Sequence, residues 1–231
     1  MNKRLKFLNT FVDLFNIGQI HEIKAGTHII SLNAEQVVLA QDDPEFCEII
    51  EKSELIIPDG AGVVHGLKFL KGKHIKDVKK LAGIDLASKL LEIKEKIAVL
   101  GSKPEIIRAI KEKYGEKIVF AHHGYFSEEE IPEIISKIKA SQPELLLVGM
   151  GAPKQEKFIH KYKEDFQEII SMGVGGTLDV LAGSKKRAPE LFITLDLEWF
   201  YRLIREPFRF KRIFFRVPRF IILLITEKLR S

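Results

Sequence analysis

The chain is poor in cysteine and in long apolar runs. Cys47 is the only cysteine among the 231 residues, so no intrachain disulfide can form and a reducing compartment is expected. The longest apolar run covers residues 220–225, far short of the about 20 residues that cross a bilayer. Residues 1–20 lack the apolar core and the cleavage site of a signal peptide, so we interpret them as mature protein. If the protein binds a membrane, we therefore expect it to lie on the membrane surface.

Excess charge is also absent from most of the chain. Residues 1–195 contain 28 Lys/Arg and 28 Asp/Glu, whereas residues 196–231 contain 9 Lys/Arg, 4 Asp/Glu and 8 of the 21 aromatic residues. The net charge of +5 thus belongs to the last 36 residues. A neutral body with a basic, aromatic tail favours a soluble domain that binds an anionic surface, either a membrane or a nucleic acid.

Short apolar segments alternate with amphipathic ones along the body. This alternation predicts an α/β fold with a Rossmann-like, mostly parallel sheet flanked by helices. Strands are expected at residues 28–32, 55–58, 96–100, 118–122, 145–149 and 169–174. Helices are expected at residues 33–42, 61–71, 84–93, 103–113, 127–141 and 153–162, the first of them capped by Asn33.

The composition changes near residues 189–196. We therefore divide the chain into an α/β domain, residues 1–195, and a C-terminal helical appendage, residues 196–231. The appendage is expected to be helical, with one break at Pro207 and a second at Pro218, because proline lacks the N–H group that a helix interior needs. Its interleaved basic and apolar residues suit a helix in a bilayer interface, or a cover that packs on the body.

A glycine-rich turn follows the apolar segment in LLLVGMGAPKQE, residues 145–156. Gly149 and Gly151 let the backbone approach a ligand, and the helix that begins at Pro153 offers N–H groups to a phosphate. Lys154 adds a positive charge there, and Gln155 can both donate and accept hydrogen bonds. The alternative is a tight turn between strand and helix that binds nothing.

A second turn of this kind lies in MGVGGTLDVLAG, residues 172–183, where Gly175, Gly176 and Asp179 stand. It lacks the spacing of a dinucleotide fingerprint, because no strand with a terminal acid follows about 20 residues later. That absence disfavours a nicotinamide-dependent dehydrogenase. Two glycine turns at the same edge of a parallel sheet would flank a crevice in which such proteins bind ligands.

The third candidate is Asp59, which follows an apolar strand in IIPDGAG, residues 56–62. A carboxylate at the end of a buried strand can act as a general base on a substrate hydroxyl. The alternative is an Asp that caps the following helix, with His65 on that helix serving packing.

His122 and His123 are adjacent on a strand and point to opposite faces, so we expect no metal site there. No cofactor is expected either.

Taken together, the motifs resemble the WecG/TagA/CpsF glycosyltransferase family. The segments that carry the resemblance are SLNAEQVVLA (31–40), IIPDGAGVV (56–64), LAGIDLA (81–87), VGMGAPKQEKFI (148–159), GVGGTLDVLAGSKKRAP (173–189) and LEWFYRLIREPFRFKR (197–212). They run nearly from end to end, and the later ones are long and specific. Within the family, the TagA-like N-acetylmannosaminyltransferases of teichoic acid synthesis are the most similar branch.

The resemblance implies a peripheral enzyme on the cytoplasmic face of the cell membrane. It would transfer a sugar from a UDP-sugar to a polyprenyl-diphosphate-linked N-acetylglucosamine, with inversion at the anomeric carbon. In the TagA-like branch the sugar is N-acetylmannosamine; its uronic acid or glucose, used for capsule or exopolysaccharide, are alternatives within the family. The partners implied are these two substrates and an anionic membrane, with a homo-oligomer left open.

The resemblance also implies roles for individual residues. Asp59 corresponds to the catalytic base, and Ser31 to a threonine on the first strand of the family. Catalytic arginines of the appendage correspond to Arg202, Arg209 and Arg212. The residues expected to bind substrate are Asn33, Gly60, Gly62, Lys80, Asp85, Gly149, Gly151, Pro153, Lys154, Gln155, Gly175, Gly176 and Asp179.

Two departures and one rival interpretation remain. Lys80 stands where many members have Arg, which keeps the charge but loses the planar fork that grips a diphosphate, and Ala34 stands where Pro is frequent. The rival is a nucleic-acid-binding α/β protein with a basic arm. Because the body is neutral and carries no RNA-binding motif, we expect no nucleic-acid partner. With no metal ion, arginines and helix N-termini would stabilise the negative charge on the leaving diphosphate. Docking of the appendage on lipid would bring its arginines to the site and complete the pocket.

Overall fold

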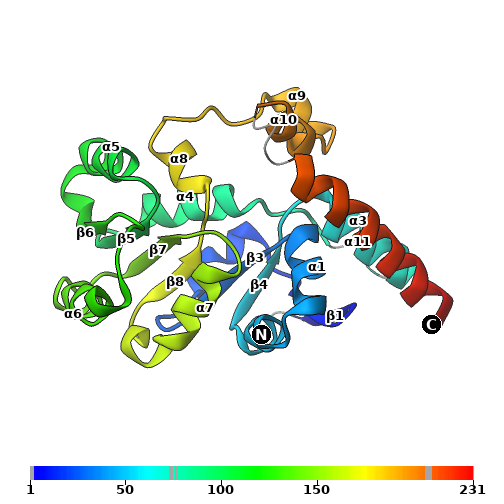
Figure 1. Ribbon diagram of the computed structural model, residues 1–231, viewed down its shortest axis with the longest axis horizontal. Coiled ribbons are helices and arrows are strands. Elements are labelled where there is room, and N and C mark those ends of the chain that lie inside the picture. The colour runs from blue at the N-terminus through cyan, green and yellow to red at the C-terminus, as the bar shows by residue number, and fades with distance from the viewer. Residues whose placement is uncertain (1–2, 73–74, 76–77, 206–209, 231) are drawn as a thin grey trace.

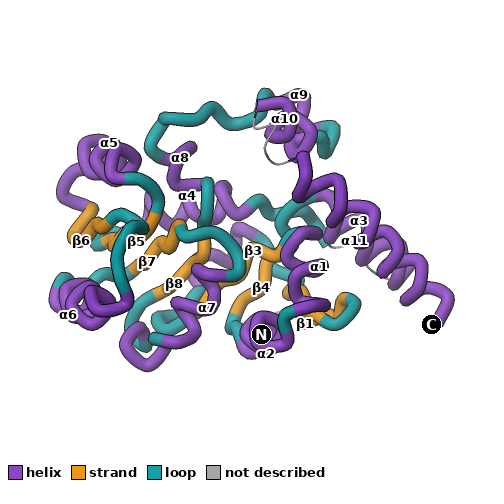
Figure 2. The backbone as a smooth tube through the Cα atoms, in the orientation of Figure 1, coloured by secondary structure: helices purple, strands orange, loops and turns teal. Residues whose placement is uncertain are grey.

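The computed structural model describes residues 3–72, 75, 78–205 and 210–230. Six parallel strands form one sheet in the order β4–β3–β8–β7–β5–β6, with helices on both faces (Figures 1 and 2). The strands are β3 (His28–Leu32), β4 (Leu55–Pro58), β5 (Ile97–Gly101), β6 (Ile118–His122), β7 (Leu145–Gly149) and β8 (Ile170–Gly173). The predicted α/β fold is confirmed, and each expected strand forms within one residue of its expected ends.

The helices follow the strands as expected. They are α1 (Ala34–Asp42), α2 (Pro44–Lys52), α3 (Ala61–Lys71), α4 (Gly83–Ile93), α5 (Pro104–Tyr114), α6 (Ile131–Ala140), α7 (Lys154–Lys161), α8 (Thr177–Leu181), α9 (Glu190–Thr194), α10 (Glu198–Arg205) and α11 (Phe210–Arg230). Asn33 caps α1, as predicted, and its side chain accepts a hydrogen bond from the backbone of Gln36. Helix α2 was not predicted. Its Pro44 occupies the first turn and Asp43 caps it, two start signals that the sequence carries.

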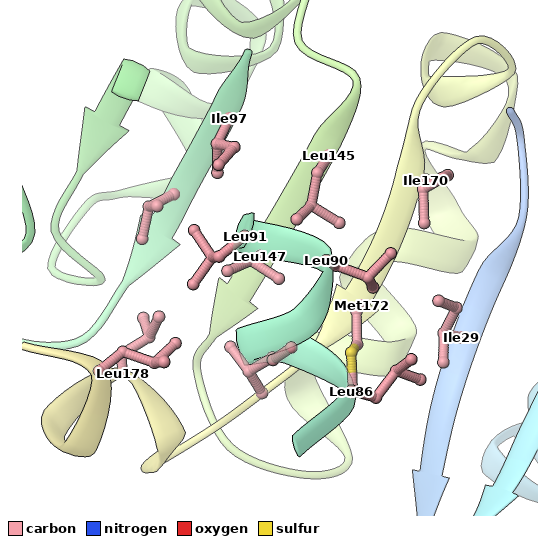
Figure 3. Packing of buried hydrophobic residues seen from close by; sticks show 14 of the residues in the cluster. Ile29, Leu86, Leu90, Leu91, Ile97, Leu145, Leu147, Ile170, Met172 and Leu178 are labelled. Carbon is pink, nitrogen blue, oxygen red and sulfur yellow. The ribbon is translucent and has the colours of Figure 1, made fainter. Parts of the chain in front are cut away.

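Alternate residues of each strand pack against different helices, because side chains of a strand point to opposite faces in turn. One face of the sheet packs on α4, whose Leu86, Leu90 and Leu91 lie over strand residues such as Ile29 and Leu145 (Figure 3). The opposite face packs on α6 and α7 over β5 and β7, and on α1, α2 and α3 over β3 and β4. Burial of each large aliphatic side chain contributes about 1.5–3 kcal/mol to folding stability, so the sheet is a rigid scaffold for the loops at its ends.

An antiparallel hairpin, β1 (Arg4–Phe7) and β2 (Thr10–Asp13), covers the β4 edge of the sheet and was not predicted. The buried carboxylate of Asp13 accepts a hydrogen bond of 2.8 Å from the backbone N–H of Ile56 on β4. Arg4 donates to both oxygens of Asp13, at 2.8 Å each, and to carbonyls at the end of α2 and the start of β4. A side chain thus occupies the hydrogen-bonding position that a further strand would use.

The appendage ends in one continuous helix, which corrects the predicted break at Pro218. Pro218 lies inside α11 on an exposed face, where water can hydrogen-bond the carbonyl that loses its partner. Around it the helix is held to α1 by ion pairs of Arg216 with Glu35 and of Arg219 with Asp42. These contacts and burial of Phe220 in the core outweigh the lost bond. Pro207, the other predicted break, lies outside the described residues.

Candidate active site

A cavity of about 620 Å³ lies at the carboxyl ends of the central strands. Ser31 is the penultimate residue of β3, Asp59 follows β4, and the two glycine turns follow β7 and β8, so the topology brings the three predicted regions together. The segment after α8 and the helices α10 and α11 close the opposite side. Figure 1 shows this segment running from α8 along the top of the molecule to α9 and α10.

Ser31 and Asp59 form a pair on the cavity wall. The hydroxyl of Ser31 donates a hydrogen bond of 2.7 Å to Oδ2 of Asp59. Gly83, at the start of α4, makes the room for it, since a Cβ there would lie 2.4 Å from the Ser31 oxygen. Gly60 is the N-cap of α3 and has no side-chain cap, so Asp59 does not serve the capping role considered as the alternative. The pair holds a carboxylate in a fixed orientation toward the cavity.

Gln155 joins the two glycine turns. Its Oε1 accepts hydrogen bonds from the backbone N–H groups of Gly151, at 3.0 Å, and Gly175, at 2.9 Å. Its Nε2 donates to Glu156 at 2.8 Å. The amide is buried, and its oxygen and one of its N–H groups are used within the protein. Gln155 therefore lines the cavity and, through these hydrogen bonds, fixes the spacing of the two glycine turns.

Glu156 lies beneath the cavity and is 1% exposed. Its Oε1 accepts hydrogen bonds from the side-chain amides of Gln155 and Gln36, and its Oε2 has no hydrogen-bond partner in the described part of the chain. Burial raises the pKa of this carboxyl group from 4.5 to about 7, against the lowering effect of the two amides. This network could not be predicted from the sequence, because a Glu in the first turn of a helix is ordinarily solvated.

A basic segment, Lys185, Lys186 and Arg187, contributes to the cavity wall. In the sequence these residues belong to the motif at residues 173–189, and none of them was predicted to be a site residue. Arg187 donates two parallel hydrogen bonds to Asp85 on α4, from Nη1 to Oδ1 at 2.6 Å and from Nη2 to Oδ2 at 2.9 Å. The carboxylate of Asp85 raises the pKa of the guanidinium, with a smaller effect from Asp59. Asp85, predicted to bind substrate, thus faces Arg187 and is absent from the cavity lining.

The predicted site residues divide into two groups. Ser31, Asn33, Asp59, Gly151, Gln155, Gly175 and Gly176 line the cavity, although the Asn33 side chain is used as a helix cap. Gly60, Gly62, Lys80, Asp85, Gly149, Pro153, Lys154 and Asp179 lie outside its lining.

Local partners account for several of the residues in the second group. Lys80 donates to Oδ1 of Asp196 at 2.6 Å and to the carbonyl of Ile193, which places it at the start of the appendage. Asp179 pairs with Lys185 at 2.6 Å. Lys154 is exposed to solvent. A Cβ at Gly149 would lie 2.4 Å from the side chain of Leu178, so this glycine is required for packing.

The appendage contributes Tyr201, Arg205 and Arg216 to the cavity lining. None of the three was among the predicted site residues. Arg209 lies outside the described residues, as do the side chains of Arg202 and Arg212, so these three predictions stay predictions. In the parts of the chain that are described, no group of three or more His, Cys, Asp or Glu residues could hold a metal ion.

Known proteins resemble this chain along nearly its whole length. The family described as "Glycosyl transferase WecG/TagA/CpsF family" matches residues 8–231. A protein of Bacillus subtilis (strain 168), named N-acetylglucosaminyldiphosphoundecaprenol N-acetyl-beta-D-mannosaminyltransferase, is 33% identical over 230 residues, 96% of this chain and 87% of the relative. A protein of the same name from Bacillus spizizenii (strain ATCC 23059 / NRRL B-14472 / W23) is 32% identical over 233 residues, 97% of this chain and 88% of the relative. Because the family model and both relatives cover nearly the whole chain, it belongs to the WecG/TagA/CpsF family and is a glycosyltransferase.

Proposed function

We propose that this enzyme transfers N-acetylmannosamine from UDP-N-acetylmannosamine to a polyprenyl-diphosphate-linked N-acetylglucosamine, with inversion at the anomeric carbon. The names of the two Bacillus relatives support the sugar and the acceptor. The observation that carries the proposal is the Ser31–Asp59 pair on the wall of a cavity bounded by two glycine turns. Its volume of about 620 Å³ is in the usual range for small-molecule sites.

In the proposed mechanism Asp59 takes the proton from the attacking hydroxyl of N-acetylglucosamine. The hydrogen bond from Ser31 preorganises the carboxylate, so that it is already oriented for proton transfer when the acceptor binds. The hydroxyl oxygen forms a bond to the anomeric carbon while the bond to the UDP oxygen breaks, and UDP leaves with the electron pair. One displacement with one base inverts the anomeric centre. Positive charge on the appendage side, from Arg205 and Arg216, would stabilise charge on the diphosphates.

The lipid-linked acceptor requires that the enzyme work at a membrane surface. No described helix has the length and apolar character to cross a bilayer. Large apolar side chains are instead exposed along α10 and α11, namely Trp199, Phe200, Ile204, Phe214, Phe215, Ile221, Ile222, Ile225 and Leu229. Together with the basic residues of the appendage they support docking on an anionic leaflet, with the helices lying in its interface. We place this docking on the cytoplasmic face, where nucleotide sugars are made.

The test is release of UDP from UDP-N-acetylmannosamine, with and without a short-chain acceptor analogue, by the wild type and Asp59→Asn. Release that needs the acceptor and falls by about 100-fold or more in the variant supports the reaction and the base, since general bases contribute about 10²–10⁴-fold. Unaltered turnover in Asp59→Asn would exclude Asp59 as the base. Release from UDP-glucose or from the uronic acid derivative, and not from UDP-N-acetylmannosamine, would replace the donor and keep the family.

A further inference from the structure

The geometry points to Arg187 as a residue that binds a substrate diphosphate, held in position for this by Asp85. This inference rests on the proposed function in one respect, namely that both substrates carry a diphosphate. Neither residue was expected to act in this way: Asp85 was predicted to bind the substrate itself, and no role was predicted for Arg187. In the structure the carboxylate of Asp85 orients the guanidinium group of Arg187, and Arg187 lines the cavity.

The two hydrogen bonds to Asp85 fix the plane of the guanidinium group. A bidentate pair of this kind restrains both the position and the rotation of an arginine side chain. Asp85 lies in the first turn of α4, and that helix packs on the sheet through Leu86 and Leu90, so the carboxylate stands on a rigid element. Arg187 lies in the segment after α8, which has no regular structure. The pair therefore attaches a loop residue to the core at the edge of the cavity.

The pairing leaves donors of Arg187 unused. A guanidinium group carries five N–H donors, and the two bonds to Asp85 use two of them. Nε is buried and makes no hydrogen bond to any described residue. The side chain is 35% exposed where it lines the cavity. Each Nη also keeps one N–H group that Asp85 does not use. These N–H groups can donate to an anionic ligand in the cavity, and a diphosphate offers several acceptor oxygens.

Its surroundings distinguish Arg187 from Lys80, one of the cations predicted to bind substrate. Lys80 is engaged by Asp196 and by the carbonyl of Ile193, and it is not part of the cavity lining. Arg187 and Asp59 line the same cavity. A diphosphate bound at Arg187 would therefore lie near the base that activates the acceptor hydroxyl. The fork of an arginine also matches phosphate oxygens better than the single ammonium of a lysine.

The experiment compares Arg187→Gln, Arg187→Lys, Asp85→Asn and the double variant Asp85→Asn/Arg187→Gln with the wild type. Arg108→Gln, an exposed arginine on α5, is the matched control. The measurements are KM for donor and for acceptor, kcat, and calorimetric binding of UDP and of a short-chain prenyl-diphosphate N-acetylglucosamine. Melting temperatures report folding, and both side chains are partly exposed, so the variants are expected to fold.

Arg187→Gln is expected to weaken binding of one diphosphate ligand by roughly 10- to 100-fold, the range for loss of a charge-assisted hydrogen bond. A loss confined to UDP assigns Arg187 to the donor, and a loss confined to the prenyl ligand assigns it to the acceptor. Arg187→Lys should recover part of the affinity. Asp85→Asn should weaken the same ligand less, and should have no further effect in the Arg187→Gln background, because Asp85 acts through Arg187.

Three results would overturn the inference. The first is affinity for both ligands within twofold of the wild type in Arg187→Gln. The second is tighter binding in Asp85→Asn, which would mean that Asp85 only neutralises the arginine. The third is an additive loss in the double variant, which would mean that Asp85 acts independently. Because calorimetric binding does not require turnover, the result stands even where the wild type fails to transfer N-acetylmannosamine.

Discussion

Replacement of Glu156 by Gln should change the pH dependence of folding stability. In the folded protein the buried carboxyl group has a pKa of about 7, whereas its ordinary value is 4.5. Below pH 4.5 the group is protonated in both states and does not favour unfolding. As the pH rises from 4.5 to about 7, the unfolded chain loses this proton first, so the free energy of unfolding falls. The loss amounts to about 3 kcal/mol and is complete above pH 7.

A glutamine at position 156 does not ionise, and its carbonyl oxygen can accept the same two hydrogen bonds from Gln36 and Gln155. The variant should therefore gain stability relative to the wild type as the pH increases. The difference between the two free energies of unfolding is expected to grow by about 3 kcal/mol from pH 4.5 to pH 8. For a chain of this size that corresponds to about 6–12 °C in Tm.

The measurement is urea unfolding of both proteins at intervals between pH 4.5 and pH 8, with thermal melts as a second readout. Glu129→Gln, an exposed glutamate before α6, controls for removal of one negative charge. Parallel stability curves for wild type and Glu156→Gln would refute the reasoning, because they would mean that the carboxyl group titrates alike in the folded and unfolded states. A variant whose stability falls relative to that of the wild type as the pH rises would refute it as well.

Two further substitutions test the site and the appendage. Gly83→Ala places a Cβ against the Ser31 hydroxyl and should displace the Ser31–Asp59 pair. We expect at least a tenfold loss of kcat, with donor binding retained. Wild-type kinetics in this variant would show that the pair is not required. Phe220→Ala should destabilise the fold by about 3–5 kcal/mol in urea unfolding, because this ring is 4% exposed in the core, whereas Phe215→Ala, at a ring 71% exposed, should stay within about 0.5 kcal/mol. Equal effects of the two would show that α11 is not anchored at Phe220.

Much of the fold could be predicted because it depends on local patterns. The six strands are short, continuous apolar runs, and strands buried on both faces need that composition. The hairpin β1–β2 escaped prediction because its stability comes from the contacts of Asp13 and Arg4 with a distant strand edge. The break expected at Pro218 was wrong for a related reason, since tertiary contacts of α11 outweigh the local preference of proline.

The candidate site divides in the same way. Ser31, Asp59 and the glycine turns could be placed together from topology alone, because the carboxyl ends of parallel strands meet at one edge. Partners of charged side chains could not be predicted. Lys80 pairs with Asp196, and Asp85 pairs with Arg187, although each pair is separated by more than a hundred residues. Such pairings depend on how a loop and an appendage return to the sheet, which no local pattern specifies.

The packing of Phe7 against Phe220 has a consequence for how the protein is made. The two rings, 6.1 Å apart between centroids, lie more than two hundred residues apart in the sequence, and they pack beside α3, Phe7 near Gly66 and Phe220 near Gly62. Ribosomes add about 5–20 residues each second, so a nascent chain carries Phe7 for roughly 10–40 s before Phe220 exists. During that interval the apolar faces of α1 and α3 lack their last cover. These faces are thus covered only after Phe220 has been synthesised, and translation pauses before that residue would prolong their exposure to aggregation and to chaperones.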